Sequence, residues 1–532
     1  MAFHAYIPVQ PRLSRCAFAL LLGGAFSLAA CQKMDSDAPA PQAAGADASA
    51  VVTRTRINSS VDLTRPGLTV PPHFLGFSLE HQNIVSFFAG YRPGNAVTPA
   101  FLQLLNNLKT YQTRGLILRI GGDSSDEAWW NPTGAAKPRG ISIDYTDREL
   151  SILKNVVDGA GAKVIFGLNF GQNNPNLAIA LGQQAQQKLG NSLLFQEIGN
   201  EPDLYYTNKY PGGGTVRPSS YNYSTFFTEY KRFLAALKAG GIQRMAAPAA
   251  TTYDWMNSFT QSASFDQVRD QVQALTYHRY PYSASTVTIS KILRDSAASY
   301  LAAGPTGNGG VKPMVARAAG YGRPLYLSEV GSAAVGGKDG VSNTFASALW
   351  GLDVMFNMAN VGVAGMQFHT TDAGFYSPFQ FRRAGGASGT FTPVVHPFYY
   401  AMLLFAQATT NEARLLPVSF NTPSNVKVWA TLDKNGVVRV VGINKTANEN
   451  FNIKVTLSAV RPAGTLVTLK APALDAKTGV SLAGQTFDGS SDGTIQGSFA
   501  SIPIQAVDNA VGTKDYFFNV DRNSAALLTI AP

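Results

Sequence analysis

The sequence predicts a (β/α)8 barrel joined to a C-terminal antiparallel β-sandwich. Between residues 61 and 410, short apolar runs alternate with segments that have helical spacing. Beyond residue 411, strand-like runs follow one another without helices between them, separated by Gly, Asn and Asp turns. The length of 532 residues is sufficient for a barrel and a smaller second domain.

Eight apolar runs are the expected barrel strands. Alternation of such runs with helices is typical of parallel strands joined by crossover helices, and eight units match the size of this barrel. The runs cover residues 74–80, 116–120, 163–170, 192–201, 245–249, 274–280, 325–329 and 362–369. Helical spacing occurs at 101–111, 148–157, 177–189, 226–237, 345–358 and 398–406.

The remaining strand-like runs predict the sandwich, residues 411–532. They cover 426–432, 437–444, 451–457, 465–469, 502–507 and 525–530. Residues 51–57 alternate in the same manner before the barrel begins. The segment 51–60 is therefore a candidate additional strand of the sandwich.

The N-terminus has the pattern of an export signal. Arg12 and Arg15 precede an apolar run over residues 16–30, which is too short to span a bilayer. The run ends in Leu-Ala-Ala-Cys, which resembles a bacterial lipobox acylated at Cys31, and Gln32 then favours the outer membrane. We expect a lipoprotein signal peptide (1–31) and a flexible tether (32–50). A plain signal peptide with an incidental cysteine is the alternative.

Composition limits the chemistry and the partners of the exported body. The two cysteines, Cys16 and Cys31, both lie in the leader, so neither a disulfide nor thiol catalysis is expected. The formal net charge of +10 favours anionic partners, and an oligo- or polysaccharide fits an exported protein better than nucleic acid does. Plain solubility also explains this charge. Membrane contact is expected only through a lipid on Cys31, at the periplasmic or outer surface of the outer membrane.

Two glutamates at predicted strand ends are the candidate catalytic pair. Glu201 ends the fourth run in "FQEIGNEPD", and Glu329 ends the seventh run in "LYLSEVGS". Barrel enzymes place their catalytic groups at the C-terminal ends of strands. Glycoside cleavage needs one protonated and one ionised carboxyl across the sugar, and repulsion and burial can supply the difference in pKa. A single glutamate at a strand end is more often a salt-bridge residue, but the pair favours catalysis.

No cofactor or metal is expected. The sequence has no phosphate-binding, dinucleotide-binding or Ser-His-Asp motif in a matching context. His278 and His369 lie near strand ends without a third ligand at metal-binding spacing.

Several motifs together resemble glycoside hydrolase family 79, which comprises β-glucuronidases and heparanases. They are "LRIGGDSSDEAWW", "EIGNEPD", "YHRYP", "SEVGS" and "AGFY". The Asn-Glu-Pro sequence and the strand-seven glutamate are also similar to clan A glycoside hydrolases in general. The resemblance implies that Glu201 is the general acid/base and Glu329 the nucleophile of a retaining reaction.

The same resemblance implies roles for four neighbouring residues. Asn200 is expected to bond the sugar 2-hydroxyl, and Glu80 to bond other sugar hydroxyls. Arg119 would orient the nucleophile and keep it ionised, and Tyr280 would bond it. The alternatives are an ordinary buried ion pair for Arg119, a helix cap or salt bridge for Glu80, and aromatic packing for Tyr280.

A third group of residues is implied to hold a uronate carboxylate. Tyr376 is expected to contact it, and Gly336 and Gly337 to offer backbone N–H groups, since glycine allows close approach of the backbone. A flexible turn is the alternative for the two glycines. The chain departs from the family at Ala334, where members often have a tyrosine, and this weakens the expectation of a uronic acid substrate.

We therefore expect an exo-acting, retaining β-glucuronidase for glucuronic-acid-containing glycans. One alternative is an endo-acting, heparanase-like enzyme with the same mechanism. The other is a non-catalytic, glycan-binding surface lipoprotein.

Overall fold

The computed structural model describes residues 52–112, 114–294, 310–384, 390–422 and 425–532. The predicted signal peptide, the tether and the lipidation site Cys31 lie outside these residues and stay predictions. Val52–Pro532 form one compact unit, so the predicted domain boundaries within it also stay predictions. Of the helices that the structure describes, none has both the length and the apolar character that a membrane span requires.

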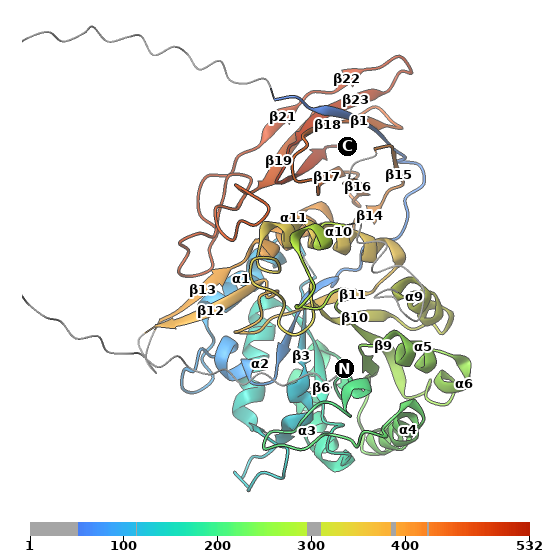
Figure 1. Cartoon of the computed structure of the whole chain (residues 1–532), viewed down its shortest axis with the longest axis vertical. Helices are drawn as coiled ribbons and strands as arrows, with labels where there is room; N and C mark the ends of the chain where they lie inside the picture. The colour runs from blue at the N-terminus through green and yellow to red at the C-terminus, as the bar shows by residue number, and fades with distance from the viewer. Residues whose placement is uncertain (1–51, 113, 295–309, 385–389, 423–424) are drawn as a thin grey trace, which may run out of the picture. The chain divides into compact units, whose positions relative to one another are not determined.

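Eight parallel strands close into a barrel, which confirms the predicted fold class (Figure 1). Around the barrel the order is β10-β11-β2-β3-β6-β7-β8-β9. The strands are β2 (Leu75–Glu80), β3 (Ile117–Gly121), β6 (Lys163–Leu168), β7 (Leu193–Ile198), β8 (Met245–Ala250), β9 (Val272–Arg279), β10 (Leu325–Val330) and β11 (Gly365–His369). Nearly every strand residue is buried, because side chains fill the interior and helices cover the outside.

Helices connect the strands as predicted, with short additions. They are α1 (Pro99–Lys109), α2 (Asp147–Ala160), α3 (Pro175–Leu189), α4 (Tyr223–Ala239), α5 (Tyr253–Phe259), α6 (Ser262–Phe265), α7 (Ile289–Ile292), α9 (Val311–Gly320), α10 (Phe345–Val361) and α11 (Pro397–Ala408). Local sequence sets their ends. For example, α2 begins with a capping box between Thr146 and Glu149, and Gly161 ends it at φ 63°.

The C-terminal strands form two further sheets, with orders β15-β1-β18-β23-β22 and β14-β16-β17-β24-β19-β20. Their strands are β1 (Thr55–Val61), β14 (Arg414–Leu415), β15 (Val418–Phe420), β16 (Val426–Leu432), β17 (Val438–Asn444), β18 (Phe451–Leu457), β19 (Gly464–Lys470), β20 (Ser481–Leu482), β21 (Ile502–Ile504), β22 (Val507–Asp508), β23 (Lys514–Val520) and β24 (Ser524–Ile530). The two sheets enclose a separate apolar core.

The predicted N-terminal strand is present as β1, the blue arrow among the red strands of Figure 1. It pairs in parallel with β18 and antiparallel with β15. The predicted antiparallel sandwich therefore contains one parallel pair of strands. The predicted strand 502–507 is wrong as a single element. Its first half, β21, pairs with β19, whereas its second half, β22, pairs with β23 in the other sheet.

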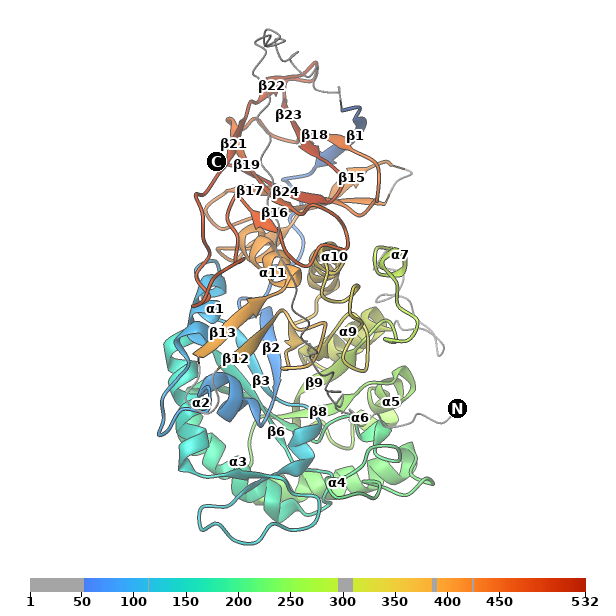
Figure 2. The ribbon, with the colours of Figure 1, turned by 60° about the vertical axis from the view of Figure 1, so that its left-hand side comes forward.

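Helices α10 and α11 lie between the barrel and the C-terminal sheets in both views (Figures 1 and 2). All but the last two residues of α10 and all residues of α11 except Gln407 are buried, whereas α1 and α4 bury one face. A helix that is apolar all round must be covered on all sides. The sheets supply that cover on the face away from the barrel.

Two pairs of short strands border the catalytic end of the barrel and were not predicted. They are β4 (Ala128–Trp130) with β5 (Ile143–Tyr145), and β12 (Phe379–Ala384) with β13 (Thr390–Val395). The first pair follows β3 and the second follows β11, so both extend the connections where barrel enzymes bind their ligands.

Candidate active site

The two predicted catalytic glutamates lie close together at the C-terminal ends of the barrel strands. Glu329 lies within β10, and Glu201 lies three residues beyond the end of β7. Glu201 has φ 46°, a left-handed backbone conformation that is costly for a residue other than glycine. Its N–H donates to Ala249 O at 2.9 Å, which fixes this bend against the end of β8.

The separation of the two carboxyls suits attack across a sugar. A carboxylate oxygen of Glu201 and one of Glu329 lie within 4.8 Å of each other. Retaining glycosidases hold their two carboxyls about 5–5.5 Å apart, whereas inverting ones need about 6.5–9.5 Å for an intervening water. The geometry therefore fits the retaining arrangement.

Glu201 and Glu329 have opposite pKa shifts. Burial, and after it the negative charge of Glu329, raise the pKa of Glu201 well above the ordinary range of a carboxyl. Burial opposes ionisation of Glu329 as well, but the positive groups around it, led by His369, hold its pKa well below that range. One carboxyl is thus protonated and the other ionised at the same pH.

Arg119 is the permanent cation beside the nucleophile position. Its fully buried guanidinium donates from Nη1 to Glu329 Oε2 at 2.6 Å and from Nη2 to Asn200 Oδ1 at 2.9 Å. It also donates from Nε to Glu197 Oε2 at 2.7 Å. Arg119 carries a single positive charge and shares it between these two side chains, so a second cation beside Glu329 would add to its stabilisation.

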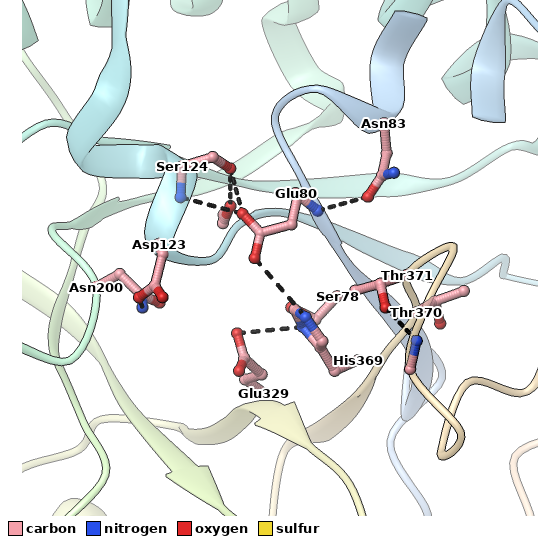
Figure 3. A network of polar contacts seen from close by, with 12 residues as sticks. Ser78, Glu80, Asn83, Asp123, Ser124, Asn200, Glu329, His369, Thr370 and Thr371 are labelled. Carbon is pink, nitrogen blue, oxygen red and sulfur yellow. Dashed lines mark hydrogen bonds and ion pairs between the residues drawn. The ribbon is translucent and has the colours of Figure 1, made fainter. Parts of the chain in front are cut away.

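His369 supplies the second cation. Its Nδ1 lies 3.3 Å from Glu329 Oε2, and its Nε2 lies 3.7 Å from Glu80 Oε1 (Figure 3). Burial alone would lower the pKa of His369, but these two carboxylates raise it. The sequence suggested no such role for His369.

His278 is neutral and carries its hydrogen on Nδ1. Arg119 Nη2 lies 3.3 Å from His278 Nε2, and an arginine can only donate, so Nε2 is the acceptor. Nδ1 therefore donates to Glu201 Oε1, which lies 2.9 Å away. Burial lowers the pKa of His278 to about 4, which agrees with a neutral ring.

This tautomer decides the chemistry of the Glu201–His278–Glu329 group, whose polar atoms lie within reach of a single cation. An Nδ1 that carries hydrogen has no lone pair to give to a metal. It also occupies Glu201 Oε1, so the acidic proton of Glu201 resides on Oε2. The group is better suited to proton transfer than to metal binding.

The other predicted residues lie around Glu201 and Glu329. Tyr280 donates from its hydroxyl to Glu329 Oε1 at 2.7 Å, where the resemblance placed it. Asn200 donates from Nδ2 to Asp123 Oδ1 at 2.9 Å. Glu80 accepts from the N–H of Ser124 at 3.1 Å and also from its hydroxyl, and burial raises its pKa to about 7 (Figure 3).

The predicted carboxylate-binding residues lie on two adjoining loops. Gly336 and Gly337 follow β10 and have φ 79° and 74°. Phe375 N donates to Gly336 O at 2.7 Å, which joins this loop to the one that carries Tyr376. The ring of Tyr376 lies 5.7 Å from that of Tyr280, whose hydroxyl donates to Glu329, so the loop of Tyr376 lies near the two glutamates.

Sequence reasoning did not find Glu197, Ser78 or Asp123, and gave His278 and His369 no catalytic role. Each lies within or just after an apolar run and belongs to no recognised motif spacing. A signal was present at Glu197, because a carboxylate in the middle of a buried strand requires a partner. The partner could not be identified, because Arg119 is 78 residues away in the sequence.

Comparisons with known proteins find β-glucuronidases among the relatives of this chain. No family model matches the chain. A β-glucuronidase of Aspergillus niger is 26% identical over 416 residues, which cover 72% of this chain and 74% of that protein. A β-glucuronidase of Neurospora crassa is 24% identical over 356 residues, 59% of this chain and 60% of that protein.

Solved structures share the fold. A 4-O-α-L-rhamnosyl-β-D-glucuronidase from Fusarium oxysporum superposes with a TM-score of 0.70 at 19% identity, covering 89% of this chain and 100% of that one. An α-L-arabinofuranosidase from Thermotoga petrophila has a TM-score of 0.62 at 14% identity, covering 89% of this chain and 99% of that one.

The barrel, its paired carboxyls and these relatives define the chain as a glycoside hydrolase. Within that class it is β-glucuronidase-like, in agreement with the resemblance of its motifs to glycoside hydrolase family 79.

Proposed function

We propose that the chain is a retaining β-glucuronidase in which Glu201 is the general acid/base and Glu329 is the nucleophile. The observation that carries the proposal is the approach of their carboxylate oxygens to within 4.8 Å, combined with opposite pKa shifts. Glu201 gives its Oε2 proton to the leaving oxygen while a Glu329 oxygen bonds to the anomeric carbon. Water then attacks that carbon, Glu201 takes the proton of the water, and Glu329 is released.

The neighbouring residues stabilise each stage of this cycle. Arg119, His369 and Tyr280 hold Glu329 ionised and oriented before attack. Asn200, fixed at both ends of its amide by Arg119 and Asp123, is positioned for the sugar 2-hydroxyl. Hydrogen bonds to that hydroxyl strengthen in the transition state.

A uronate substrate is supported by the curated relatives, both of which are named β-glucuronidase. It is also supported by the loop of Gly336 and Gly337, whose N–H groups donate no hydrogen bond within the described residues. Successive backbone N–H groups of a loop can bind an anion when they point to the same side. Ala334, whose methyl group cannot donate, leaves this recognition to the backbone and to Tyr376.

A panel of aryl β-glycosides tests the proposal. We expect kcat/KM for the glucuronide to exceed that for the glucoside, the galactoside and the arabinofuranoside by at least about tenfold, the size of a charge-assisted contact. Glu329→Gln should abolish the glucuronidase activity. Glu412→Gln is the matched control, because Glu412 is 40% exposed and pairs with Arg114 on the surface. Higher activity on a neutral sugar would overturn the uronide assignment.

Exo action is the form that we propose. Incubation with polymeric heparan sulfate tests it, because an endo-acting enzyme shortens the chains early whereas an exo-acting one leaves their length nearly unchanged. Rapid shortening of the polymer would replace the exo assignment with the heparanase-like alternative.

A further inference from the structure

Val335 combines a strained backbone with an exposed apolar side chain. Its φ is 61°, and among the described residues it is the only β-branched one with a positive φ. Such a conformation is a genuine outlier for a β-branched residue. The residue is 83% exposed, the highest value among the exposed large hydrophobic residues of the described chain, so packing does not offset the strain. Strain that the core does not require points to a functional role.

Backbone hydrogen bonds on both sides hold Val335 in place. The N–H of Ala334 donates to Tyr282 O at 2.8 Å, and Gly336 O accepts from the N–H of Phe375 at 2.7 Å. The loop after β10 is therefore joined to the loop after β9 and to the loop after β11. Val335 lies between these two attachments, so its position is defined before a ligand arrives.

The two attached loops lead to the nucleophile. Tyr280 donates to Glu329, and the ring of Tyr280 lies 5.7 Å from that of Tyr376. The residue before Tyr376 is Phe375, which is itself 40% exposed. Val335 and Phe375, which we call the apolar rim, are therefore exposed on loops that border Glu329.

The proposed carboxylate-binding loop relates the apolar rim to the sugar. Gly336 and Gly337 directly follow Val335. In a β-glucuronide, C5 carries the carboxylate and C1 carries the leaving oxygen, and both carbons are bonded to the ring oxygen. The carboxylate and the leaving group therefore flank the same edge of the sugar ring. A side chain next to the carboxylate can reach the leaving group along this edge.

The connection to β9 favours the leaving group as the part of the substrate that Val335 contacts. Tyr282, which accepts from the residue before Val335, lies just after β9. His278 of β9 donates to Glu201, the proposed general acid. The leaving oxygen must lie within hydrogen-bond reach of Glu201. Val335 is thus attached to the side of the site from which the leaving group departs.

An apolar rim favours an apolar leaving group. Contact with Val335 and Phe375 removes apolar surface from water, which stabilises the complex in proportion to the area buried. A charged leaving group would lose hydration at the same surface without gaining a hydrogen bond. The difference between these two free energies is a specificity.

We propose that Val335 is a specificity-determining residue, which together with Phe375 binds the apolar part of the leaving group. The proposal rests on the proposed glucuronidase function and on the place of Gly336 and Gly337 in it. It defines the substrate class as glucuronides whose leaving group has an aromatic or alkyl surface beside the bond that is cleaved.

Phenyl and 4-tert-butylphenyl β-glucuronides test this, because the two phenols have nearly equal acidity and differ in apolar surface. We expect kcat/KM for the tert-butyl compound to exceed that for the phenyl compound by about fivefold or more, as burial of about two methyl groups predicts. Cleavage of both compounds at equal rates would overturn the apolar rim and leave the glucuronidase function intact. Failure to cleave either compound would overturn the function itself.

Variants of the apolar rim locate the preference. Val335→Asn removes the apolar group and adopts positive φ more readily, so the ratio of the two kcat/KM values should fall to about twofold or less. The free energy of unfolding should stay unchanged or rise, which separates this loss from misfolding. Phe375→Ala should also lower the ratio, because the hydrogen bond to Gly336 is made by the backbone and remains.

Two further variants complete the test. Val335→Leu keeps an apolar side chain without the β-branch and should keep the ratio above about threefold. Val511→Asn is the matched control, because Val511 is a 79% exposed valine among the C-terminal strands, and it should leave the ratio unchanged. A ratio in Val335→Asn equal to that in Val511→Asn would contradict the role of Val335.

Discussion

Individual polar contacts determine which of the two carboxyls is protonated and which is ionised. His278 occupies one oxygen of Glu201 and leaves the other to carry a proton, whereas Glu329 receives charge from Arg119 and His369. The chemical difference between two identical side chains thus comes from their surroundings.

Glu201→Gln tests the role of the general acid. An amide cannot donate a labile proton, so kcat/KM for an aryl glucuronide with a poor leaving group should fall about 10²–10⁴-fold. A dinitrophenyl leaving group departs without protonation, so kcat/KM for a dinitrophenyl glucuronide should fall much less. The dependence of kcat/KM on leaving-group pKa measures this difference. Equal losses for both substrates would contradict an acid role.

The pH dependence of kcat/KM follows from the two opposite shifts. Activity requires Glu329 ionised and Glu201 protonated. The acid limb should therefore lie below the ordinary carboxyl pKa of about 4.3, and activity should fall on the alkaline side as Glu201 loses its proton. In Glu201→Gln, assayed with the dinitrophenyl substrate, the alkaline limb should disappear. Its persistence would assign that limb to another group.

Loops at the ends of strands carry the residues that we propose to recognise substrate. Gly337→Ala places a Cβ 2.9 Å from Ser342 Oγ and 3.0 Å from Tyr376 N, whereas a Cβ at Gly336 meets nothing within 4 Å. Because both glycines have positive φ, the two variants share backbone strain but differ in crowding.

We expect Gly337→Ala to lower kcat/KM for the aryl glucuronide by about 10–100-fold, since small displacements of a binding loop are costly. Gly336→Ala should lose less than about fivefold, the effect of strain alone. Steady-state kinetics of both variants measure the difference. Similar losses would show that crowding against Tyr376 is unimportant.

The helices and strands that could be predicted are those in which apolar residues recur with a clear period. All eight barrel runs were found, because buried parallel strands between amphipathic helices give a repeated pattern. The β12–β13 pair was missed, because it is an insertion after β11 whose sequence has no regular apolar periodicity. Strand β23 was missed although "KDYFFNV" alternates, because loops surround it without a regular spacing.

The candidate site was predictable where a residue type at a strand end is informative. Glu201 and Glu329 were singled out in this way and lie close together in the structure. Arg119 and Tyr280, which the resemblance associated with Glu329, both donate hydrogen bonds to it. Glu197 and His369 depend on pairing between distant strands, which one sequence does not reveal. Glu201 also lies outside β7, although the apolar run predicted it as the last strand residue.

At the level of the whole molecule, one buried ion pair joins the barrel to the C-terminal sheets. Lys445, just after β17, lies 2.5 Å from Asp353 of α10, and neither side chain is exposed. Trp429 of β16 donates to the same carboxylate at 3.1 Å. A buried pair of this kind fixes the docking of two layers, and loss of one partner leaves the other charge without compensation.

Asp353→Asn should therefore lower the free energy of unfolding by about 3–5 kcal/mol. Asp158→Asn is the matched control, since Asp158 is 55% exposed and pairs with Lys154 on the surface of α2; it should change stability by less than about 0.5 kcal/mol. Urea unfolding followed by tryptophan fluorescence measures both. Equal stability of the two variants would refute a structural role for the pair.

The most direct test of the mechanism is to identify the residue that becomes glycosylated. A 2-deoxy-2-fluoro-β-glucuronyl fluoride forms the covalent intermediate through its good leaving group, and its fluorine slows the release step. Mass spectrometry of the digested protein should show one sugar per chain, on the peptide that contains Glu329, and none in Glu329→Gln. A sugar attached to Glu201, or turnover without any covalent adduct, would contradict the nucleophilic role of Glu329.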